Sequence, residues 1–214
     1  MRKWKRDLLR LRQKIKQERN RINMTSQTLR EARKYEEASE KMIKQEERPD
    51  FHLSVRTGWM NDPNGFSYYN GQYHLFYQYN PYAPRWDSMH WGHAVTKDFL
   101  HWDYLPAALA PDEAYDRDGC FSGSALTLPD GRQLLMYTGV LRERKENGEH
   151  CDTQTQCLAV GDGVDYEKCA GNPVLDKNDI PEGSSVHDFR DPKMWQAEDG
   201  TYCCVVGNRP ADGS

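Results

Sequence analysis

Apolar and charged residues alternate with a helical period over residues 1–48. Apolar side chains recur there at steps of three and four residues, and charged residues fill the positions between them. The recurring apolar residues are Trp4, Leu8, Leu11, Ile15, Ile22 and Leu29. The pattern pauses near Met24, and Thr28 followed three residues later by Glu31 fits a capping box. Because this spacing places an apolar stripe along a helix, we expect residues 1–48 to form a charged, helical N-terminal extension.

From Phe51 onward the pattern changes to that of strands and turns. Short runs such as 73–79 and 154–160 are rich in aromatic or alternating apolar residues, and clusters of Gly, Asn, Asp and Pro separate them. Such runs predict short strands joined by turns. No segment with a helical period interrupts them. We therefore expect residues 49–214 to form an all-β body.

A unit of strand, turn glycine and strand occurs three times within that body. The copies begin at Asp62, Ser122 and Asp191, and in each copy a glycine follows nine residues later, ahead of an apolar strand. Each interval leaves room for about four short strands, which is the content of one β-propeller blade. Since a blade cannot bury both of its faces alone, blades stack around an axis. The repeat predicts about two and a half blades, with Asp62, Ser122 and Asp191 at one axial pocket.

The distribution of charge divides the chain at a similar place. Residues 1–50 contain 16 Lys and Arg against 9 Asp and Glu, whereas the remaining residues contain 13 against 24. The acidic body makes nucleic acid an unexpected partner. For the basic residues 1–23 two interpretations stay open. They form either an arm that binds a partner or nucleic acid, or a solvated helix or upstream extension that precedes Met24 as the natural start. Nothing in the pattern indicates an oligomeric state.

Apolar runs and cysteine spacing bear on the compartment and on cofactors. The N-terminus lacks the apolar run of a secretory signal, and no window approaches the roughly eighteen apolar residues of a membrane span. We therefore expect a cytoplasmic protein without a membrane partner, whose six cysteines are reduced thiols. No Cys-x-x-Cys pair occurs, which argues against a structural zinc site. We expect no metal and no organic cofactor.

Two carboxylates that meet at an axial pocket suit the chemistry of a sugar. Cleavage of a glycosidic bond commonly uses a pair of carboxyl groups, one ionised and one protonated. Aromatic rings stack on the C–H faces of sugar rings, and amide side chains bind hydroxyl groups. Residues of these types near the repeat positions are Trp59, Asn61, Asn64, Gln78, Trp86, Trp91 and Phe121. Asn61–Gly65 is also ordinary turn chemistry, but two Asp-Pro units at matching places in a repeat favour a functional site.

Five motifs carry a resemblance to a known family. They are Trp59–Gly65 (WMNDPNG), Phe76–Pro81 (FYQYNP), Met89–His93 (MHWGH), Phe121–Ser124 (FSGS) and Phe189–Pro192 (FRDP). In this order they resemble glycoside hydrolase family 32. The resemblance implies a five-bladed β-propeller followed by a β-sandwich. It also implies hydrolysis of sucrose, sucrose-6-phosphate or short fructans, by a double displacement that retains the configuration at the fructose anomeric carbon.

The same resemblance assigns roles to individual residues. By motif, Asp62 resembles the nucleophile that forms a fructosyl-enzyme, and Asp191 resembles the residue that stabilises the transition state through fructose hydroxyls. The remaining matched positions imply a substrate-binding set of Trp59, Met60, Asn61, Gln78, Trp86, Phe121, Ser122 and Arg190. A fructofuranoside forms an oxocarbenium-like transition state readily, so an ionised Asp is a sufficient nucleophile.

The family's general acid is absent from the sequence. The resemblance implies a Glu in a Glu-Cys pair well after the Arg-Asp-Pro motif, and no Glu-Cys pair occurs before Ser214. Glu198 is the only Glu after Asp191, and it lies in a predicted hairpin turn. We therefore expect a fragment of a longer reading frame or a truncated product, unstable alone because strand edges and blade faces stay exposed. The alternative to an enzyme is a catalytically incompetent sugar-binding remnant that needs another polypeptide segment.

Overall fold

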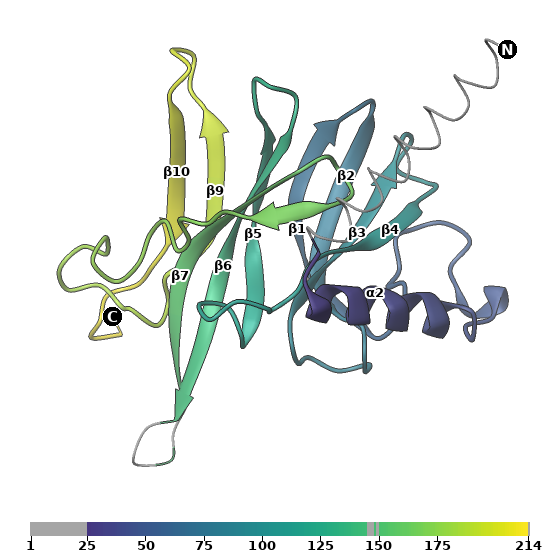
Figure 1. Cartoon of the computed structure of the whole chain (residues 1–214), viewed down its shortest axis with the longest axis horizontal. Helices are drawn as coiled ribbons and strands as arrows, with labels where there is room; N and C mark the ends of the chain where they lie inside the picture. Colours follow the sequence, from purple (N-terminus) through teal and green to yellow (C-terminus); the bar gives the residue numbers. More distant parts are fainter. Residues whose placement is uncertain (1–24, 145–147, 149, 214) are drawn as a thin grey trace, which may run out of the picture.

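The structure is a computed structural model that describes residues 25–144, 148 and 150–213. Antiparallel strands dominate these residues and form three sheets, which lie side by side across the molecule (Figure 1). The predicted all-β architecture of the body is confirmed. The predicted helix over residues 1–23 lies outside the described residues.

Within each sheet the strands follow their order in the chain. The first sheet contains β1 (Trp59–Tyr69), β2 (Gln72–Asn80), β3 (His90–Thr96) and β4 (Asp103–Leu109). The second contains β5 (Gly119–Thr127), β6 (Gln133–Arg144), β7 (His150–Gly161) and β8 (Tyr166–Lys168). The third pairs β9 (Arg190–Gln196) with β10 (Tyr202–Gly207). The helix α2 (Gln27–Glu40) and the short 3-10 helix η1 (Gln45–Glu47) precede them. Four antiparallel strands in chain order are the content of one propeller blade.

The first hairpin of every sheet closes on one of the predicted turn glycines. Gly71, Gly131 and Gly200 have φ angles of 81°, 83° and 87°. A side chain at Gly71 or Gly131 would meet no atom within 4 Å. The backbone conformation, rather than a lack of space, therefore requires glycine at these turns. The predicted repeat of strand, turn glycine and strand is confirmed.

The main hydrophobic core lies between the first and second sheets. Phe76 and Trp91 from the first sheet are fully buried against Leu135 and Tyr137 from the second. Alternate residues of each strand point to this interface, as the two-residue period of a strand requires. The two sheets are therefore held together by the stacking of apolar faces that the propeller interpretation predicts.

The helix α2 begins earlier than the sequence pattern predicts. Ser26 is its N-cap, and the Ser26 hydroxyl accepts a hydrogen bond from the backbone N–H of Leu29 at 3.1 Å. The predicted capping box at Thr28 and Glu31 is therefore wrong. Glu31 instead accepts a hydrogen bond from the Gln27 side chain at 2.8 Å, an ordinary i,i+4 pair on an exposed face.

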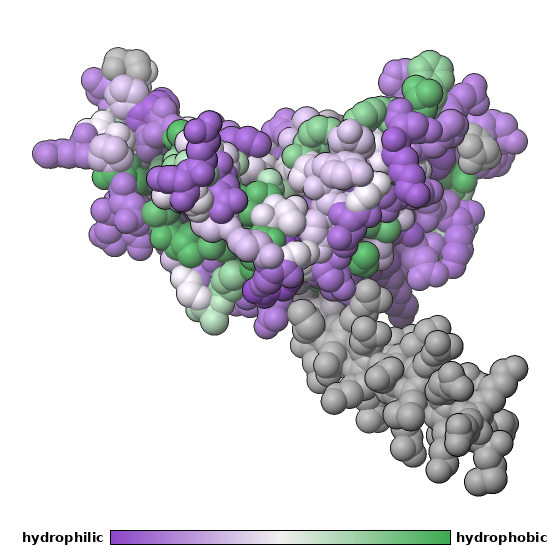
Figure 2. All heavy atoms as spheres, turned by 90° about the horizontal axis from the view of Figure 1, so that it is seen from above, coloured by the Kyte–Doolittle hydropathy of each residue, from purple (hydrophilic) through white to green (hydrophobic). Residues whose placement is uncertain are grey.

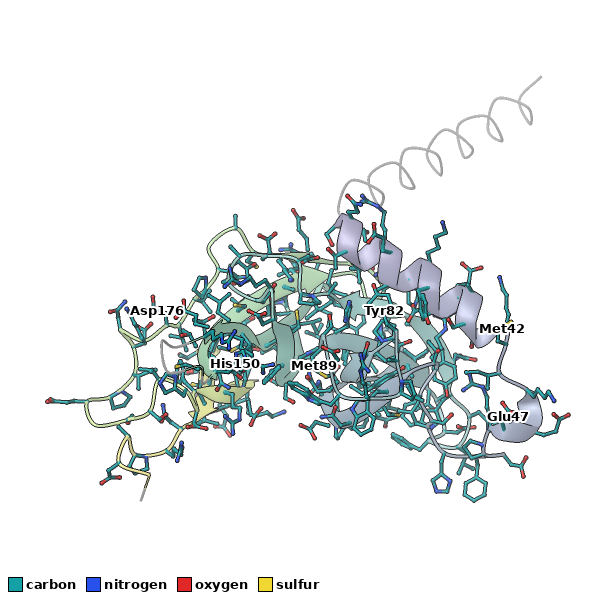
Figure 3. The ribbon with its side chains drawn as sticks, turned by 90° about the horizontal axis from the view of Figure 1, so that it is seen from below. Met42, Glu47, Tyr82, Met89, His150 and Asp176 are labelled. Atoms are coloured by element: carbon teal, nitrogen blue, oxygen red, sulfur yellow. The ribbon has the colours of Figure 1, made fainter. Side chains whose placement is uncertain are left out.

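One face of α2 is buried against the first sheet. Leu29 is part of a second apolar cluster, and Ala32 is fully buried. The sheet contributes Tyr77, Tyr79, Ala94 and Ala107 to that cluster. Tyr82, labelled in Figure 3, lies beside the helix, where its ring centre is 5.1 Å from that of Tyr35. α2 thus covers apolar surface of the body.

Buried ion pairs fasten the same helix to the body. Arg56 Nη1 lies 3.0 Å from Glu36 Oε1, and the same carboxylate oxygen accepts the backbone N–H of Ala107 at 2.9 Å. Arg33 Nη1 lies 2.6 Å from Asp165 Oδ1 in the turn between β7 and β8. Because Glu36 is buried with its partners, removing one of them would leave an uncompensated charge. These charges of α2 are therefore structural contacts between the helix and the body.

A buried lysine joins the end of the second sheet to the connection that leaves the first. Lys168 Nζ contacts Asp112, lies 2.5 Å from Asp116 Oδ2, and donates to the carbonyl of Ala110 at 2.7 Å. The Tyr137 hydroxyl donates to the same Asp116 oxygen at 2.7 Å. The Lys168 side chain is only 10% exposed. One ammonium therefore binds two carboxylates in a place that is mostly shielded from water.

The third sheet presents an open edge. Among the described strands, β10 pairs with β9 alone. Tyr202 and Val205 on β10 and Trp195 on β9 are exposed, and hydrophobic atoms reach the surface at this end of the molecule (Figure 2). An unpaired strand with apolar side chains is a surface onto which further strands can add.

In the part of the chain that the structure describes, no helix has the length and apolarity needed to cross a bilayer.

Candidate active site

Asp62 occupies a bulge in β1. Asn61 pairs with Gln78 on β2, and Pro63 pairs with the next residue, Tyr77, so that Asp62 has no partner in the ladder. Pro63 has no N–H to give to the ladder, which suits a bulge. A bulge inserts one extra residue into a strand and redirects its side chain. The sequence Asn-Asp-Pro therefore turns the Asp62 carboxylate out of the regular alternation of the sheet.

Ser122 occupies the same kind of bulge at the start of the second sheet. On β5, Phe121 pairs with Thr138 and Gly123 pairs with Tyr137, which leaves Ser122 as the extra residue. A Cβ atom on Gly123 would lie 1.9 Å from a backbone oxygen of β6. Glycine is therefore required immediately after the bulge, because the two strands approach closely there.

Asp191 completes the series on the third sheet. Arg190 pairs with Gly207 and Lys193 pairs with Val205, so Asp191 and the residue after it oppose a single residue of β10. The strands β1, β5 and β9 contact one another in this order. The three repeat positions therefore have the same local structure on three neighbouring strands.

These three strands enclose one cavity of about 460 Å³. Each strand contributes three or more consecutive residues to its wall, beginning at the bulge. The lining is Asp62, Pro63, Asn64, Gly65, Phe66, Ser122, Gly123, Ser124, Asp191, Pro192 and Lys193. The structure thus brings Asp62, Ser122 and Asp191 to one cavity. Both Asp side chains are exposed at this cavity, as groups that act on a bound molecule must be.

The two carboxyl groups of the cavity influence each other. Burial raises the pKa of Asp191 above its ordinary value, the charge of Arg190 opposes this shift, and the charge of Asp62 adds to it. Arg190 Nε lies 3.8 Å from Asp191 Oδ2, and Arg190 Nη1 lies 3.0 Å from Asp188 Oδ1. The guanidinium is therefore shared between two carboxylates. Arg190 therefore opposes the effect of burial on Asp191 and favours its ionised form.

A buried network holds Asp191 in an unfavourable backbone conformation. Asp191 has a φ angle of 61°, in the left-handed region that L-residues seldom adopt. Its N–H donates to Thr138 Oγ1 at 3.2 Å, and the Thr138 hydroxyl donates to Gln156 Oε1 at 2.9 Å. Gln156 Nε2 donates in turn to the carbonyl of Phe189 at 2.6 Å. Thr138 and Gln156 are fully buried, so the second sheet fixes the direction of Asp191 from behind.

Replacing Thr138 by Val is expected to loosen the backbone conformation of Asp191. The change removes the acceptor of the Asp191 N–H and the donor to Gln156, which costs about 1–3 kcal/mol of stability. Urea unfolding would measure this loss as a lower unfolding midpoint. Thr138→Ser keeps the hydroxyl and should unfold closer to the wild-type midpoint; an equal loss of stability in both variants would show that the hydroxyl is not the cause.

Three other predicted residues surround the first bulge without lining the cavity. Trp59 Nε1 donates to Asn61 Oδ1 at 2.9 Å, which fixes the Asn61 amide beside Asp62. Gln78 is buried, and its Nε2 donates to the carbonyl of Cys120 at 3.0 Å. This hydrogen bond ties β2 to β5 directly before Phe121 and Ser122. These contacts support the geometry of the site from the side of the first sheet.

Trp86, Phe121 and Met60 also lie outside the cavity lining. The ring of Trp86 meets that of Phe121 edge-on at 6.0 Å, and Trp86 is 46% exposed. Met60 packs against the apolar cluster that includes Leu29 and Tyr77, so the structure places it with the core rather than at the cavity. Trp86 and Phe121 form an aromatic rim next to Ser122.

Some residues of the site were not identified by sequence reasoning. Lys193 and Ser124 line the cavity, and the Ser124 hydroxyl accepts the backbone N–H of Met194 at 2.9 Å, which joins β5 to β9. Ser124 belongs to the motif Phe121–Ser124, so its position was a usable signal.

Asn64 was expected to bind hydroxyl groups. It is 2% exposed, and both of its amide atoms lack a protein partner. Both amide atoms are themselves buried, so the amide lies within the cavity wall and presents no exposed donor or acceptor to the cavity.

The arrangement suits a polyhydroxylated ligand. The lining combines two carboxylates, an amide, hydroxyl groups and one ammonium, with aromatic rings beside it. Across the described ranges, no group of three or more His, Cys, Asp or Glu residues is placed to hold a metal ion. Carboxylates accept hydrogen bonds from sugar hydroxyls, and an ionised carboxylate can also attack an anomeric carbon.

Comparison with known proteins identifies relatives that share this region. The family model "Glycosyl hydrolases family 32 N-terminal domain" matches residues 52–213. Sucrose-6-phosphate hydrolase of Zymomonas mobilis is 44% identical over 176 residues, which are 82% of this chain and 33% of that protein. Raffinose invertase of Escherichia coli is 46% identical over 166 residues, which are 76% of this chain and 33% of that protein. The chain spans about a third of the length of these curated relatives.

A solved structure agrees with the sequence relatives. The Bombyx mori GH32 beta-fructofuranosidase superposes with a TM-score of 0.73 at 40% identity, over 85% of this chain and 37% of that chain. The matched family region contains the five motifs and the three bulge positions. The family predicted from the motifs is therefore confirmed. The chain belongs to glycosyl hydrolase family 32, and residues 52–213 match the N-terminal domain of that family.

Proposed function

We propose that this chain contributes the fructosyl-binding part of a β-fructofuranosidase site, which hydrolyses sucrose, sucrose-6-phosphate or short fructans. The observation that carries the proposal is the meeting of Asp62 and Asp191 in one cavity, at bulges of β1 and β9, which both contact β5. The names of the relatives support this substrate class: sucrose-6-phosphate hydrolase, raffinose invertase and a beta-fructofuranosidase, a mutant of which was also solved in complex with sucrose.

In the proposed reaction Asp62 is the nucleophile. Its carboxylate oxygen forms a bond to the anomeric carbon of the fructosyl unit while the bond to the leaving oxygen breaks, and a fructosyl ester results. Water then attacks the same carbon, gives one proton to the group that earlier protonated the leaving oxygen, and releases fructose and the Asp62 carboxylate. Two displacements at one carbon retain its configuration. The bulge supports this role because it leaves the Asp62 side chain exposed at the cavity.

Asp191 has the role of binding fructose hydroxyls as positive charge develops on the sugar. Its fixed direction, set by Thr138 and Gln156, supports this role, because preorganised groups stabilise a transition state without reorganising. Arg190 holds Asp188 and stands beside Asp191, where its charge favours the ionised form. Trp59, Asn61 and Gln78 then shape the fructosyl pocket from the first sheet.

A third group must protonate the leaving oxygen. The described lining contains two carboxyl groups, both from Asp, and the Glu-Cys pair expected of the family's general acid does not occur in the sequence. We place the general acid outside these 214 residues, in the part of the relatives that the chain does not match. Positioned acid catalysis contributes typically about 10²–10⁴-fold, so slow turnover of natural substrates by this chain alone is expected.

The cavity lining, in which both carboxyl groups come from Asp, also favours a second candidate function, which is sugar binding without turnover. A cavity with a nucleophile and a stabilising carboxylate, but without an acid, can bind a fructosyl unit and fail to release the leaving group. In this case the chain acts as a sugar-binding module or is completed by another polypeptide segment. Binding of sucrose without release of fructose would distinguish this function from hydrolysis.

The proposal includes the architecture of the whole site. In this architecture residues 49–214 form the first part of a five-bladed propeller, with two blades and the first half of a third, and residues 1–48 are an extension that precedes it. The open edge of β10, with Tyr202 and Val205 exposed, supports this arrangement, because further strands would cover it. The first strands of later blades would then close the cavity around its axis.

Calorimetric titration of the chain with fructose and with sucrose tests the proposed function. Both sugars should bind, and Asp191→Ala should weaken both by about tenfold or more, since a hydrogen bond to a charged group contributes about 1.5–3 kcal/mol. Asp199→Ala, a change at an exposed Asp in the β9–β10 turn, is the matched control and should leave both affinities unchanged. Absence of fructose binding by the unmodified, folded chain would contradict the proposal.

A further inference from the structure

Asp188 is an ionised carboxylate that lies just outside the candidate active site. It precedes Asp191 by three residues and is not part of the cavity lining. Its side chain is 20% exposed, and it accepts hydrogen bonds from Arg209, Arg190 and Ser185. The hydrogen bond from Arg209 is the main cause of a pKa of about 2 for Asp188. Asp188 is therefore negatively charged at neutral pH, and no step of the proposed reaction uses it.

One oxygen of Asp188 is fixed by the segments that flank the third sheet. Asp188 Oδ2 accepts hydrogen bonds from Ser185 Oγ at 3.0 Å and from Arg209 Nε. The backbone N–H of Ser185 donates to the carbonyl of Arg209 at 2.8 Å, and Asn208 Nδ2 donates to the carbonyl of Ser185 at 3.1 Å. These contacts join the segment before β9 to the segment after β10 (Figure 1). Asp188 is thus held in place by residues that do not line the cavity.

The other oxygen of Asp188 binds Arg190. Asp188 Oδ1 accepts a hydrogen bond from Arg190 Nη1 at 3.0 Å. Gln154 Oε1 accepts from the same nitrogen at 3.4 Å, and Gln154 is buried. Arg190 Nη1 therefore lies between a fixed carboxylate and a buried amide. Because the guanidinium is planar and rigid, holding this one nitrogen sets the direction of the whole group.

The guanidinium of Arg190 stands beside Asp191 without forming a hydrogen bond to it. Arg190 Nε lies 3.8 Å from Asp191 Oδ2, beyond the roughly 3.2 Å of an ordinary N–H···O hydrogen bond. The positive charge still opposes the effect of burial on the pKa of Asp191. Among the described residues, none donates a hydrogen bond to the Asp191 carboxylate. The oxygens of Asp191 therefore remain open to hydroxyl groups, which donate hydrogen bonds to carboxylates.

We propose that Asp188 is a positioning residue, which keeps Arg190 beside Asp191 and prevents the two from closing into a direct ion pair. A guanidinium and a carboxylate that are free to turn pair readily through two parallel hydrogen bonds. Without the charge of Asp188, Arg190 would turn toward Asp191 and occupy the oxygens that a sugar needs. This inference rests on the proposed function, because an open Asp191 carboxylate matters only if the cavity binds a fructosyl unit.

Replacing Asp188 by Asn is expected to weaken the binding of fructose. Asn keeps the size of the side chain and an acceptor for Ser185, but it loses the charge that holds Arg190. In calorimetric titration of the 214-residue chain the affinity for fructose should fall by about tenfold, because the sugar must displace charge-assisted hydrogen bonds between Arg190 and Asp191. Asp188→Glu keeps the carboxylate and should bind fructose nearly as well as the wild type does.

A double variant separates the positioning of Arg190 from a general effect on the fold. In Arg190→Gln the group that would close on Asp191 is absent. Adding Asp188→Asn to this background should change the affinity for fructose by less than about twofold, whereas a loosened segment would weaken binding in both backgrounds. Asp130→Asn removes one exposed carboxylate at the β5–β6 turn and should leave the affinity unchanged. Urea unfolding measures the stability of each variant.

Carbon-13 NMR of the Asp191 carboxyl group gives a second measurement, which needs no sugar. The charged groups at Asp191 are Arg190, Asp62 and Lys193, which lines the same cavity. A direct pair with Arg190 favours the ionised form, so Asp188→Asn should lower the pKa of Asp191, and the lowering should be smaller in the Arg190→Gln background. If Arg190→Gln binds fructose too weakly to titrate, this comparison decides.

The outcomes separate the inference from the proposed function. An unchanged affinity for fructose in Asp188→Asn, or an equal loss in Asp188→Glu, would overturn the inference and leave the proposed function standing. An equal loss with and without Arg190, or a pKa of Asp191 that does not fall, would do the same. A folded wild-type chain that does not bind fructose would instead refute the proposed function and, with it, this inference.

Discussion

Replacing Asp62 by Asn is expected to abolish transfer of a fructosyl unit to this protein. The amide cannot attack an anomeric carbon, and it keeps the size and nearly the shape of the carboxylate. A suitable donor is β-fructofuranosyl fluoride, because fluoride leaves as an anion and needs no general acid. The rate of fluoride release by the chain should fall by about 10³-fold or more, the size of effect expected when a nucleophile is removed.

The control variant changes the net charge of the chain by the same amount as Asp62→Asn does. Asp130→Asn removes one exposed carboxylate at the β5–β6 turn, far along the hairpin from the bulge at Ser122, and should release fluoride at the wild-type rate. A fluoride-selective electrode follows both reactions directly. Release by Asp62→Asn at the wild-type rate would show that Asp62 is not the nucleophile.

Replacing Lys168 by Met is expected to be among the most destabilising changes in the molecule. Lys168 is the buried cation that faces Asp112 and Asp116, and its removal leaves two carboxylates without compensation. Breaking a buried ion pair in this way costs about 3–5 kcal/mol. Met fills a similar volume, so the loss would report charge rather than a cavity. Urea unfolding followed by tryptophan fluorescence would show a large fall in the unfolding midpoint.

Lys41→Met is the matched comparison. Lys41 pairs with Glu37 on the exposed face of α2, where its side chain is 70% exposed. Exposed helical pairs contribute only about 0.3–0.5 kcal/mol, so this variant should unfold at nearly the wild-type midpoint. If Lys168→Met unfolded as close to the wild-type midpoint as Lys41→Met does, the buried cluster would have no large role in stability.

Most of what the sequence predicts about the site follows from the repeat of strand, turn glycine and strand. Asp62, Ser122 and Asp191 were placed together because each begins a copy of strand, turn glycine and strand. That inference depends only on local spacing and on the rule that repeated units stack around an axis. The structure adds the reason why these residues face the cavity, which is a bulge at each position. A one-residue bulge leaves no clear mark on the hydrophobic pattern.

Residues that act from behind the site were beyond prediction from the sequence. Thr138 and Gln156 lie inside regular strands, and nothing in their neighbourhood distinguishes them from other polar residues of β6 and β7. Their role appears only when long-range pairing brings them under Asp191.

The N-terminal helix shows a different limit. Arg33 and Glu36 occur among many charged residues, and the pattern does not distinguish them from the others. The structure buries Glu36 and pairs both residues with the body. Charge along a helix predicts exposure on average, but a partner from a distant strand can reverse that expectation. The start of α2 was also misplaced, because Ser26 and Thr28 are both good N-cap residues.

The central claim is that Asp62 forms a covalent bond to a fructosyl unit in the cavity that it shares with Asp191. The most direct measurement is the intact mass of the chain after incubation with β-fructofuranosyl fluoride, followed by peptide mapping. We predict a single adduct with the mass of one fructosyl unit, located on Asp62 and absent from Asp62→Asn. An adduct on another residue, or fluoride release that persists in Asp62→Asn without any adduct, would contradict the account.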